Sequence, residues 1–154
     1  MSSIQRHGSG GPWEDRFGYS RIVTAGPHAW VSGCTATVDG AVRGNGDPYT
    51  QTKFAFDNAR KALEKAGFAL GDVVRTRWYV VHSRDIDEVG RAHGDIFADF
   101  RPAATVVVVS GLADAGMLVE VEVDAYRADG AGDGRSTVQT EQAEQTEEME
   151  TETP

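Results

Sequence analysis

The segment from Leu118 to Tyr126 alternates between apolar and acidic side chains, and no other feature limits the possible fold so strongly. A period of two residues is typical of a β-strand with one buried and one accessible face. One face carries small and β-branched residues, namely Val119, Val121, Val123 and Ala125. The other face carries three carboxylates, namely Glu120, Glu122 and Asp124. The chain therefore needs a sheet that is apolar on one side and polar on the other.

Two helices are predicted from the residues at their ends. Asp47-Pro48 has the composition of an N-cap followed by the first helical residue, and Gly67 lies where a left-handed C′ residue is expected. Asp85 followed by Glu88 resembles a capping box, and Arg101-Pro102 ends the second apolar stripe. We expect one helix to begin at Pro48 and a second to follow Asp85.

The remaining strands are indicated by turns and by β-branched residues. Gly26-Pro27-His28 and Asp39-Gly40 have the chemistry of hairpin turns. The almost wholly apolar segment from Ala103 to Val109 predicts a strand that is buried on both faces. Another strand is expected over Val73 to Val81, with one face made of Val74, Thr76, Trp78 and Val80 and the other of Arg75, Arg77 and Tyr79.

The order of these elements predicts an α+β fold in which two helices cover one face of a single sheet. The expected domain spans residues 13–128. It lies between a flexible N-terminus (1–12) and a disordered acidic tail (129–154), whose polar composition cannot offset the entropy cost of ordering. Because two helices cover only one face, the other face is expected to be polar or to be buried by another subunit.

The formal net charge of −9 belongs mostly to the C-terminal tail. From Ala128 onward eight acidic residues stand against Arg135 alone, a net of −7, so the rest of the chain carries −2. Neither part has the basic surface that nucleic acid or an anionic membrane attracts. A lone cysteine, Cys34, permits no intrachain disulfide, and no apolar run is long enough to span a bilayer. A cytoplasmic protein without nucleic-acid or membrane partners is therefore expected.

The three carboxylates of the last strand have two possible roles. Salt bridges to Arg75 and Arg77 are expected for two of them if the arginine strand lies alongside. The third, held in a partly dry cleft between subunits, would be a general base with a raised pKa. The spacing does not say which residue that is.

Six segments, in the same order along the chain, resemble the Rid (YjgF-like) family of imine deaminases, which have also been described as endoribonucleases. The likeness extends from about Gly18 to Arg127. The segments are Gly18-Tyr19-Ser20-Arg21, Val31-Ser32-Gly33, Gln51 to Gly67, Asp72 to Thr76, Arg101 to Thr105 and Leu118 to Glu122.

This resemblance implies a chorismate-mutase-like fold and a homotrimer whose sheets face inward, with a cleft at each subunit interface. It also implies hydrolysis of 2-imino acids to 2-oxo acids and ammonia without a metal or organic cofactor. The first glutamate of the last-strand motif would position or activate water, which assigns that role to Glu120. We expect no cofactor and no metal site, and the histidines and Cys34 lack metal-ligand spacing.

The sequence departs from the family pattern after Pro102-Ala103, where Ala104 replaces the arginine that clamps the substrate carboxylate. A methyl group cannot replace a fork of charge-assisted hydrogen bonds. The expected substrate is therefore a reactive imine, enamine or related C=N metabolite other than the usual 2-iminobutanoate or 2-iminopropanoate.

Further candidates follow from the resemblance and from side-chain chemistry. Tyr19 and Ser32 would line the cleft. Cys34 is a candidate nucleophile or a small cleft-lining residue, and a buried hydrophobe is the alternative. His93 would act as an acid or base in the pocket or would only border the core. Thr105 would offer a hydroxyl beside the missing arginine, unless it only reflects strand propensity.

Two function classes remain open from the sequence. The first is the cofactor-independent hydrolase or deaminase just described, with a small-molecule substrate. The second is a non-catalytic trimer that binds a metabolite or a protein, because loss of the arginine is compatible with lost chemistry. RNA cleavage fits poorly with a near-neutral core and an acidic tail.

Overall fold

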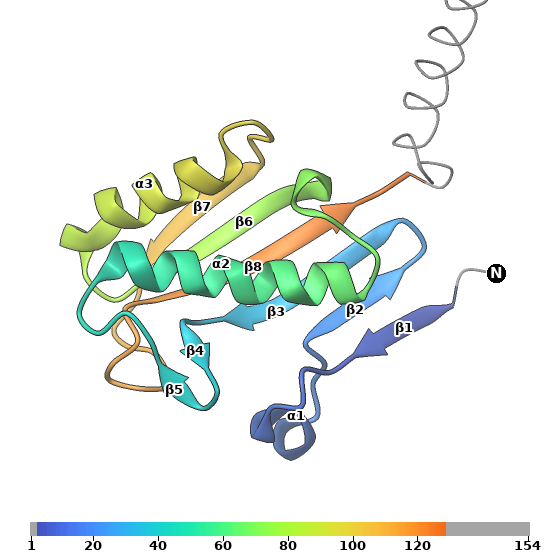
Figure 1. Cartoon of the computed structure of the whole chain (residues 1–154), viewed down its shortest axis with the longest axis horizontal. Coiled ribbons are helices and arrows are strands. Elements are labelled where there is room, and N and C mark those ends of the chain that lie inside the picture. Colours follow the sequence, from blue (N-terminus) through green and yellow to red (C-terminus); the bar gives the residue numbers. More distant parts are fainter. Residues whose placement is uncertain (1–2, 129–154) are drawn as a thin grey trace, which may run out of the picture.

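A computed structural model describes residues 3–128, which form a six-stranded sheet in the order β1-β2-β3-β8-β6-β7 (Figure 1). Neighbouring strands are antiparallel except for the parallel pair β6 and β7. The strands of this sheet are β1 (Ile4–His7), β2 (Ile22–Ala25), β3 (His28–Cys34), β6 (Val73–Val80), β7 (Ala103–Val108) and β8 (Val119–Tyr126). The helices are α1 (Pro12–Phe17), α2 (Pro48–Lys65) and α3 (Ile86–Phe97), and a separate hairpin contains β4 (Thr37–Val38) and β5 (Ala41–Val42). Short 3-10 turns span Leu70–Asp72 and Ser83–Asp85.

The two long helices α2 and α3 lie across the same face of the sheet (Figure 1). The apolar face of β8 is buried beneath them, with its four members between 0 and 2% exposed. Phe56 and Leu63 of α2 and Phe97 of α3 complete this core, and the rings of Phe56 and Phe97 meet edge to face. This confirms the predicted α+β fold with two helices on one face. Among residues 3–128, no helix covers the other face of the sheet.

Helix α2 begins and ends as its sequence predicts. The Asp47 carboxylate accepts a hydrogen bond from the backbone N–H of Tyr49 at 3.2 Å. At the other end, Gly67 has a φ of 85°. Its N–H donates to the Glu64 carbonyl, and the Phe68 N–H donates to the Leu63 carbonyl. These two bonds form a Schellman motif, which only a residue tolerant of positive φ completes without strain.

Replacing Gly67 by alanine is expected to lower the free energy of unfolding by about 1–2 kcal/mol, because its Cβ would have to adopt the left-handed conformation. Gly94 is the matched control: it lies inside α3, and an added Cβ there would meet nothing within 4 Å. Gly94→Ala is expected to stabilise the protein by about 0.5–1 kcal/mol. Urea unfolding of both variants measures the difference, and equal effects would contradict the assigned cap.

Three predictions about the strands are wrong. Val74 does not share a face with Thr76, because a register shift between Val73 and Arg75 turns Val73 inward and leaves Val74 49% exposed. Strand β7 is not buried on both faces: it lies at the sheet edge beside β6, and all six of its residues are exposed. Residues 4–7, expected within a flexible N-terminus, pair antiparallel with β2 as β1.

The predicted capping box of α3 is also absent. The helix begins at Ile86, but Asp85 has helical φ and ψ and its side chain makes no capping hydrogen bond. The 3-10 turn Ser83–Asp85 runs directly into the helix, so the N-terminal residue lacks the extended geometry that a capping box needs.

Candidate functional site

A hollow of about 770 Å³ lies on the open face of the sheet, over β2, β3, β8 and β6. It is shallow and accessible in the single chain. Its walls combine aromatic, small and charged residues: Tyr19, Val23, Trp30, Val31, Ser32, Gly33, Arg77, Glu120, Glu122 and Asp124.

Glu120 sits in this hollow directly above Gly33. A Cβ added to Gly33 would lie only 1.9 Å from Oε1 of Glu120, so the glycine provides the space that the carboxylate occupies. The register of β3 against β8 shifts between Val31 and Cys34, and Gly33 belongs to this irregular stretch. The local break in the strand therefore brings the Gly33 backbone and the Glu120 carboxylate together.

The environment of Glu120 favours its protonated form. Partial burial raises the pKa of this carboxyl above its ordinary value, and the nearby charge of Glu122 raises it further, while Arg21 opposes both. A carboxylate with a raised pKa is a stronger proton acceptor than an ordinary surface glutamate. The predicted general-base role of Glu120 stays a prediction, for which this geometry is suitable.

The other two acids of β8 face Arg77 on the neighbouring strand. Nη1 of Arg77 lies 3.2 Å from Asp124 and 3.7 Å from Glu122. Glu122 also bonds Tyr79, and this hydrogen bond raises the pKa of the phenol. The structure thus confirms that β6 lies alongside β8 and that two of the three acids form salt bridges.

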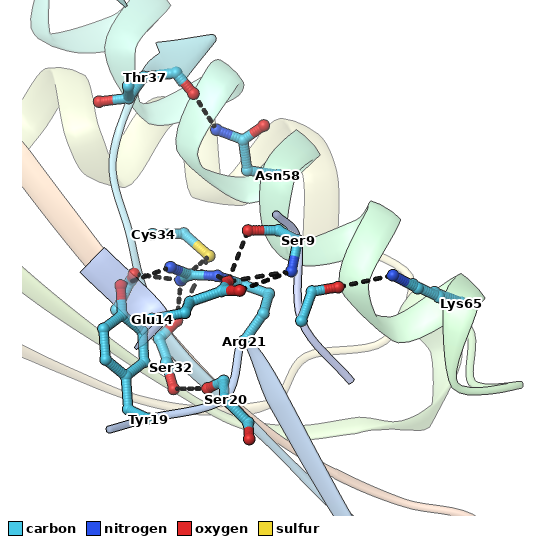
Figure 2. A network of polar contacts seen from close by, with 12 residues as sticks. Ser9, Glu14, Tyr19, Ser20, Arg21, Ser32, Cys34, Thr37, Asn58 and Lys65 are labelled. Carbon is cyan, nitrogen blue, oxygen red and sulfur yellow. Dashed lines mark hydrogen bonds and ion pairs between the residues drawn. The ribbon is translucent and has the colours of Figure 1, made fainter. Parts of the chain in front are cut away.

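Arg21 forms hydrogen bonds with residues that line the hollow, among them Tyr19 and Ser32 (Figure 2). Its Nη1 donates to the carbonyls of Ser32 and Gly33, at 3.2 and 2.5 Å, and its Nη2 donates to the Tyr19 hydroxyl at 3.4 Å. The Glu14 carboxylate lies 3.8 Å from Nε of Arg21. Arg21 therefore fixes the backbone on which Glu120 rests.

Glu14 on α1 links this arginine to the N-terminal segment. Burial would raise the pKa of Glu14, but hydrogen bonds from Ser9 and the charge of Arg21 outweigh it and hold the pKa below its usual range. Ser9 donates to Glu14 through its backbone N–H at 3.0 Å and through its hydroxyl at 2.6 Å (Figure 2). These hydrogen bonds and ion pairs connect Ser9, through Glu14 and Arg21, to the residues that line the hollow.

Tyr19 and Ser32 lie in the walls of the hollow. The Ser32 hydroxyl donates to the Ser20 carbonyl at 2.6 Å, which holds together the two segments below the hollow. Their roles in binding remain predictions.

Cys34 does not line the hollow. Its side chain is turned into the core and is 3% exposed, with Sγ 3.4 Å from Nη1 of Arg21. Burial raises the pKa of the thiol, and the nearby Arg21 offsets this only in part. The predicted cleft-lining position is wrong because the irregular stretch of β3 returns Cys34 to the helix-covered side. Its neutral thiol gives the nucleophile hypothesis no support.

His93 and Thr105 are not brought to Glu120 within one chain. His93 lies on the helix-covered side of the sheet, where Nε2 is 2.9 Å from the Thr76 hydroxyl and the ring contacts Phe97. Burial lowers the pKa of His93 to about 4. Thr105 lies on the edge strand β7 and accepts a hydrogen bond from Arg75 at 3.1 Å.

We expect His93 to make stability depend on pH between about 4 and 6.5. In this range the unfolded chain binds the proton more readily than the folded chain, so the free energy of unfolding should fall as the pH is lowered. A His93→Gln variant should lose this part of the slope. Urea unfolding at several pH values tests the expectation, and identical slopes in both proteins would contradict it.

The sequence did not indicate Arg21 or Trp30 as parts of the site. Trp30 became evident only from the pairing of β3 with β8. A signal for the Gly33 contact was present, because Ser32-Gly33 interrupts the alternation of β3 just before Cys34.

Within residues 3–128, no group of three His, Cys, Asp or Glu side chains is arranged to hold a metal ion. None of the helices described is both long enough and apolar enough to cross a membrane.

Comparisons with known proteins agree with this fold. The family model for endoribonuclease L-PSP matches residues 14–127. An uncharacterised protein of Streptomyces coelicolor is 47% identical over 125 residues, covering 81% of this chain and 93% of the relative. A RutC family protein of Pyrococcus horikoshii is 30% identical over 112 residues, covering 71% and 86%. The crystal structure of Rv2704 from Mycobacterium tuberculosis, a YjgF/YER057c/UK114 family member, has a TM-score of 0.74 and 40% identity, covering 81% of this chain and 100% of that one. The chain therefore belongs to the endoribonuclease L-PSP family, which is also called the YjgF or Rid family.

Proposed function

We propose that this protein is a cofactor-independent hydrolase that deaminates a reactive imine, enamine or related C=N metabolite. The observation that carries the proposal is the half-buried Glu120 carboxylate, seated over Gly33 in the hollow with a raised pKa. Membership of the Rid family supports a small-molecule role related to imines.

In the proposed reaction, Glu120 removes a proton from water while the water oxygen forms a bond to the imine carbon. The substrate reacts as a protonated imine, so the C=N electron pair moves to nitrogen, the double bond becomes a single bond and a neutral carbinolamine forms. Glu120 passes the proton that it took from water to the carbinolamine nitrogen. It then accepts the hydroxyl proton while the C–N bond breaks, and gives this proton to the departing ammonia, which leaves as ammonium, so that Glu120 is a carboxylate again. One water is consumed, and no atom changes its oxidation state overall.

We further propose that the hollow is completed by neighbouring subunits of a homotrimer. The exposed apolar residues of β7, including Val106 at 38% and Val108 at 49%, are an unfavourable surface for a single chain in water. Within the part of the chain that the structure describes, no helix covers the open face of the sheet. A second copy of the chain packed against β7 and against the open sheet face would bury these two surfaces and would partly close the hollow.

The test is ammonia release from imines generated in situ by an amino-acid oxidase and by a flavin-dependent amine oxidase. We expect the protein to exceed the spontaneous rate with imines that lack a carboxylate. We expect Ala104→Arg to gain turnover of 2-imino acids, because it restores a guanidinium on β7. If the protein never exceeds the spontaneous rate, the proposal is wrong. If 2-imino acids are already turned over as well as the others, the assignment of Ala104 is wrong.

A second candidate function, a non-catalytic binding trimer, is favoured by the same alanine. This function predicts that the Glu120→Gln variant still binds the ligand. It also predicts that neither the wild type nor this variant hydrolyses imines. Cleavage of RNA is disfavoured because three carboxylates line the hollow and would repel phosphate.

A further inference from the structure

The charged residues that line the hollow are unbalanced. Three are carboxylates and one is a guanidinium, so the lining carries −2 when all are ionised. Arg77 is engaged by Asp124 and Glu122, at 3.2 and 3.7 Å, rather than by Glu120.

The nearest other arginines do not correct this imbalance. The charge of Arg21 lowers the pKa of Glu120, but the Glu14 carboxylate lies 3.8 Å from Nε of Arg21 and offsets that charge. Arg75 turns away toward β7, where it donates to Thr105. The part of the chain that the structure describes therefore leaves negative charge facing the hollow.

Aromatic rings complete the lining. Tyr19 and Trp30 are 37% and 45% exposed, and both border the hollow together with the smaller Val23. The face of an aromatic ring attracts cations, most strongly for tryptophan. Carboxylates beside exposed rings are the combination that recognises an organic ammonium group with an apolar body.

We propose that the hollow selects a cationic nitrogen compound, an ammonium or iminium attached to an apolar body, and rejects carboxylates. The inference rests on the proposed function in taking the hollow as the substrate site. It also fits the chemistry, because a protonated imine accepts water at carbon more readily than a neutral one. The position of Ala104 agrees, since a substrate without a carboxylate needs no arginine clamp.

The test uses the full-length protein and three probes that share a phenyl ring on a two-carbon linker: 2-phenylethylammonium, 2-phenylethanol and 3-phenylpropanoate. Binding is followed by calorimetry and by the fluorescence of the hollow's tryptophan. We expect the ammonium to bind at least about tenfold more tightly than the alcohol, and the carboxylate to bind most weakly. Added salt should reduce this preference.

Substitutions of acidic residues inside and outside the hollow test which of them cause the preference for the ammonium probe. Glu122→Gln combined with Asp124→Asn should remove the ammonium preference and free Arg77 to bind the carboxylate probe. Asp87→Asn, an exposed acid at the start of α3 on the other side of the sheet, should leave the order of affinities unchanged.

The inference is overturned if the carboxylate binds as tightly as the ammonium, if no probe binds at millimolar concentration, or if the double variant keeps the original order. Binding and imine hydrolysis are measured on the same samples. Ammonium selectivity without imine turnover would refute the proposed function alone. Turnover of anionic imino acids without ammonium selectivity would refute this inference alone.

Discussion

Replacing Glu120 by glutamine is expected to lower kcat/KM for imine hydrolysis by about 10²–10⁴-fold, the usual contribution of a positioned general base. Glutamine has nearly the same shape as glutamate and keeps one acceptor oxygen, but it cannot accept the proton of the attacking water. The fold should not suffer. A carboxyl whose folded pKa is raised destabilises the folded state once it ionises, so the glutamine variant should unfold at the same or a higher temperature at neutral pH.

The pH dependence of the rate separates this role from a structural one. The rate should fall as the pH drops through the pKa of Glu120, and this fall should begin at a higher pH than an ordinary glutamate would give. Burial of the carboxyl raises this pKa most, the charge of Glu122 raises it further, and Arg21 lowers it. Glu122→Gln should therefore move the acidic limb to lower pH. An unchanged limb, or a glutamine variant at position 120 with full activity, would show that another group handles the proton.

Replacing Gly33 by alanine is the second large effect, with an expected loss of about 10²-fold in kcat/KM. The new methyl carbon would lie 1.9 Å from Oε1 of Glu120 in its present position. Because that oxygen ends a flexible side chain, the carboxylate should swing away rather than unfold the sheet. We therefore expect activity to fall far more than stability.

Gly111→Ala is the control for this substitution, since an added Cβ at Gly111 would meet nothing within 4 Å. It should leave both kcat/KM and the melting temperature unchanged. Circular dichroism melts and steady-state rates of the two variants are the required measurements. If the Gly33→Ala protein retained full activity, the close approach of the Glu120 carboxylate to the Gly33 backbone would not be needed for the reaction.

Features set by neighbouring residues could be predicted from the sequence. The ends of α2 follow from Asp47-Pro48 and Gly67, and the alternation of β8 identifies both its buried and its acidic face. The six segments shared with the Rid family include Tyr19 and Ser32, which line the hollow of the single chain. These signals are local, so they depend little on how the rest of the chain packs.

Features that depend on pairing between distant segments could not be predicted. The sequence does not show that Gly33 and Glu120 meet, because this depends on the register shift of β3 against β8. It left open whether His93 acts in the pocket or borders the core, and the structure places His93 on the helix-covered side of the sheet, against Thr76 and Phe97. The position of β7 at an edge, rather than inside the sheet, is likewise a matter of topology.

The contacts from Ser9 through Glu14 to Arg21 show that residues before the family match help to hold the site in place. The family match starts at residue 14, and a boundary drawn there would remove β1 and Ser9. Such a shortened protein would retain every residue that lines the hollow. Yet Glu14 would lose the hydrogen bonds that hold its pKa down, and the partner of Arg21 would be loosened. The contacts that hold Arg21 in place thus extend beyond the segment that the family model matches.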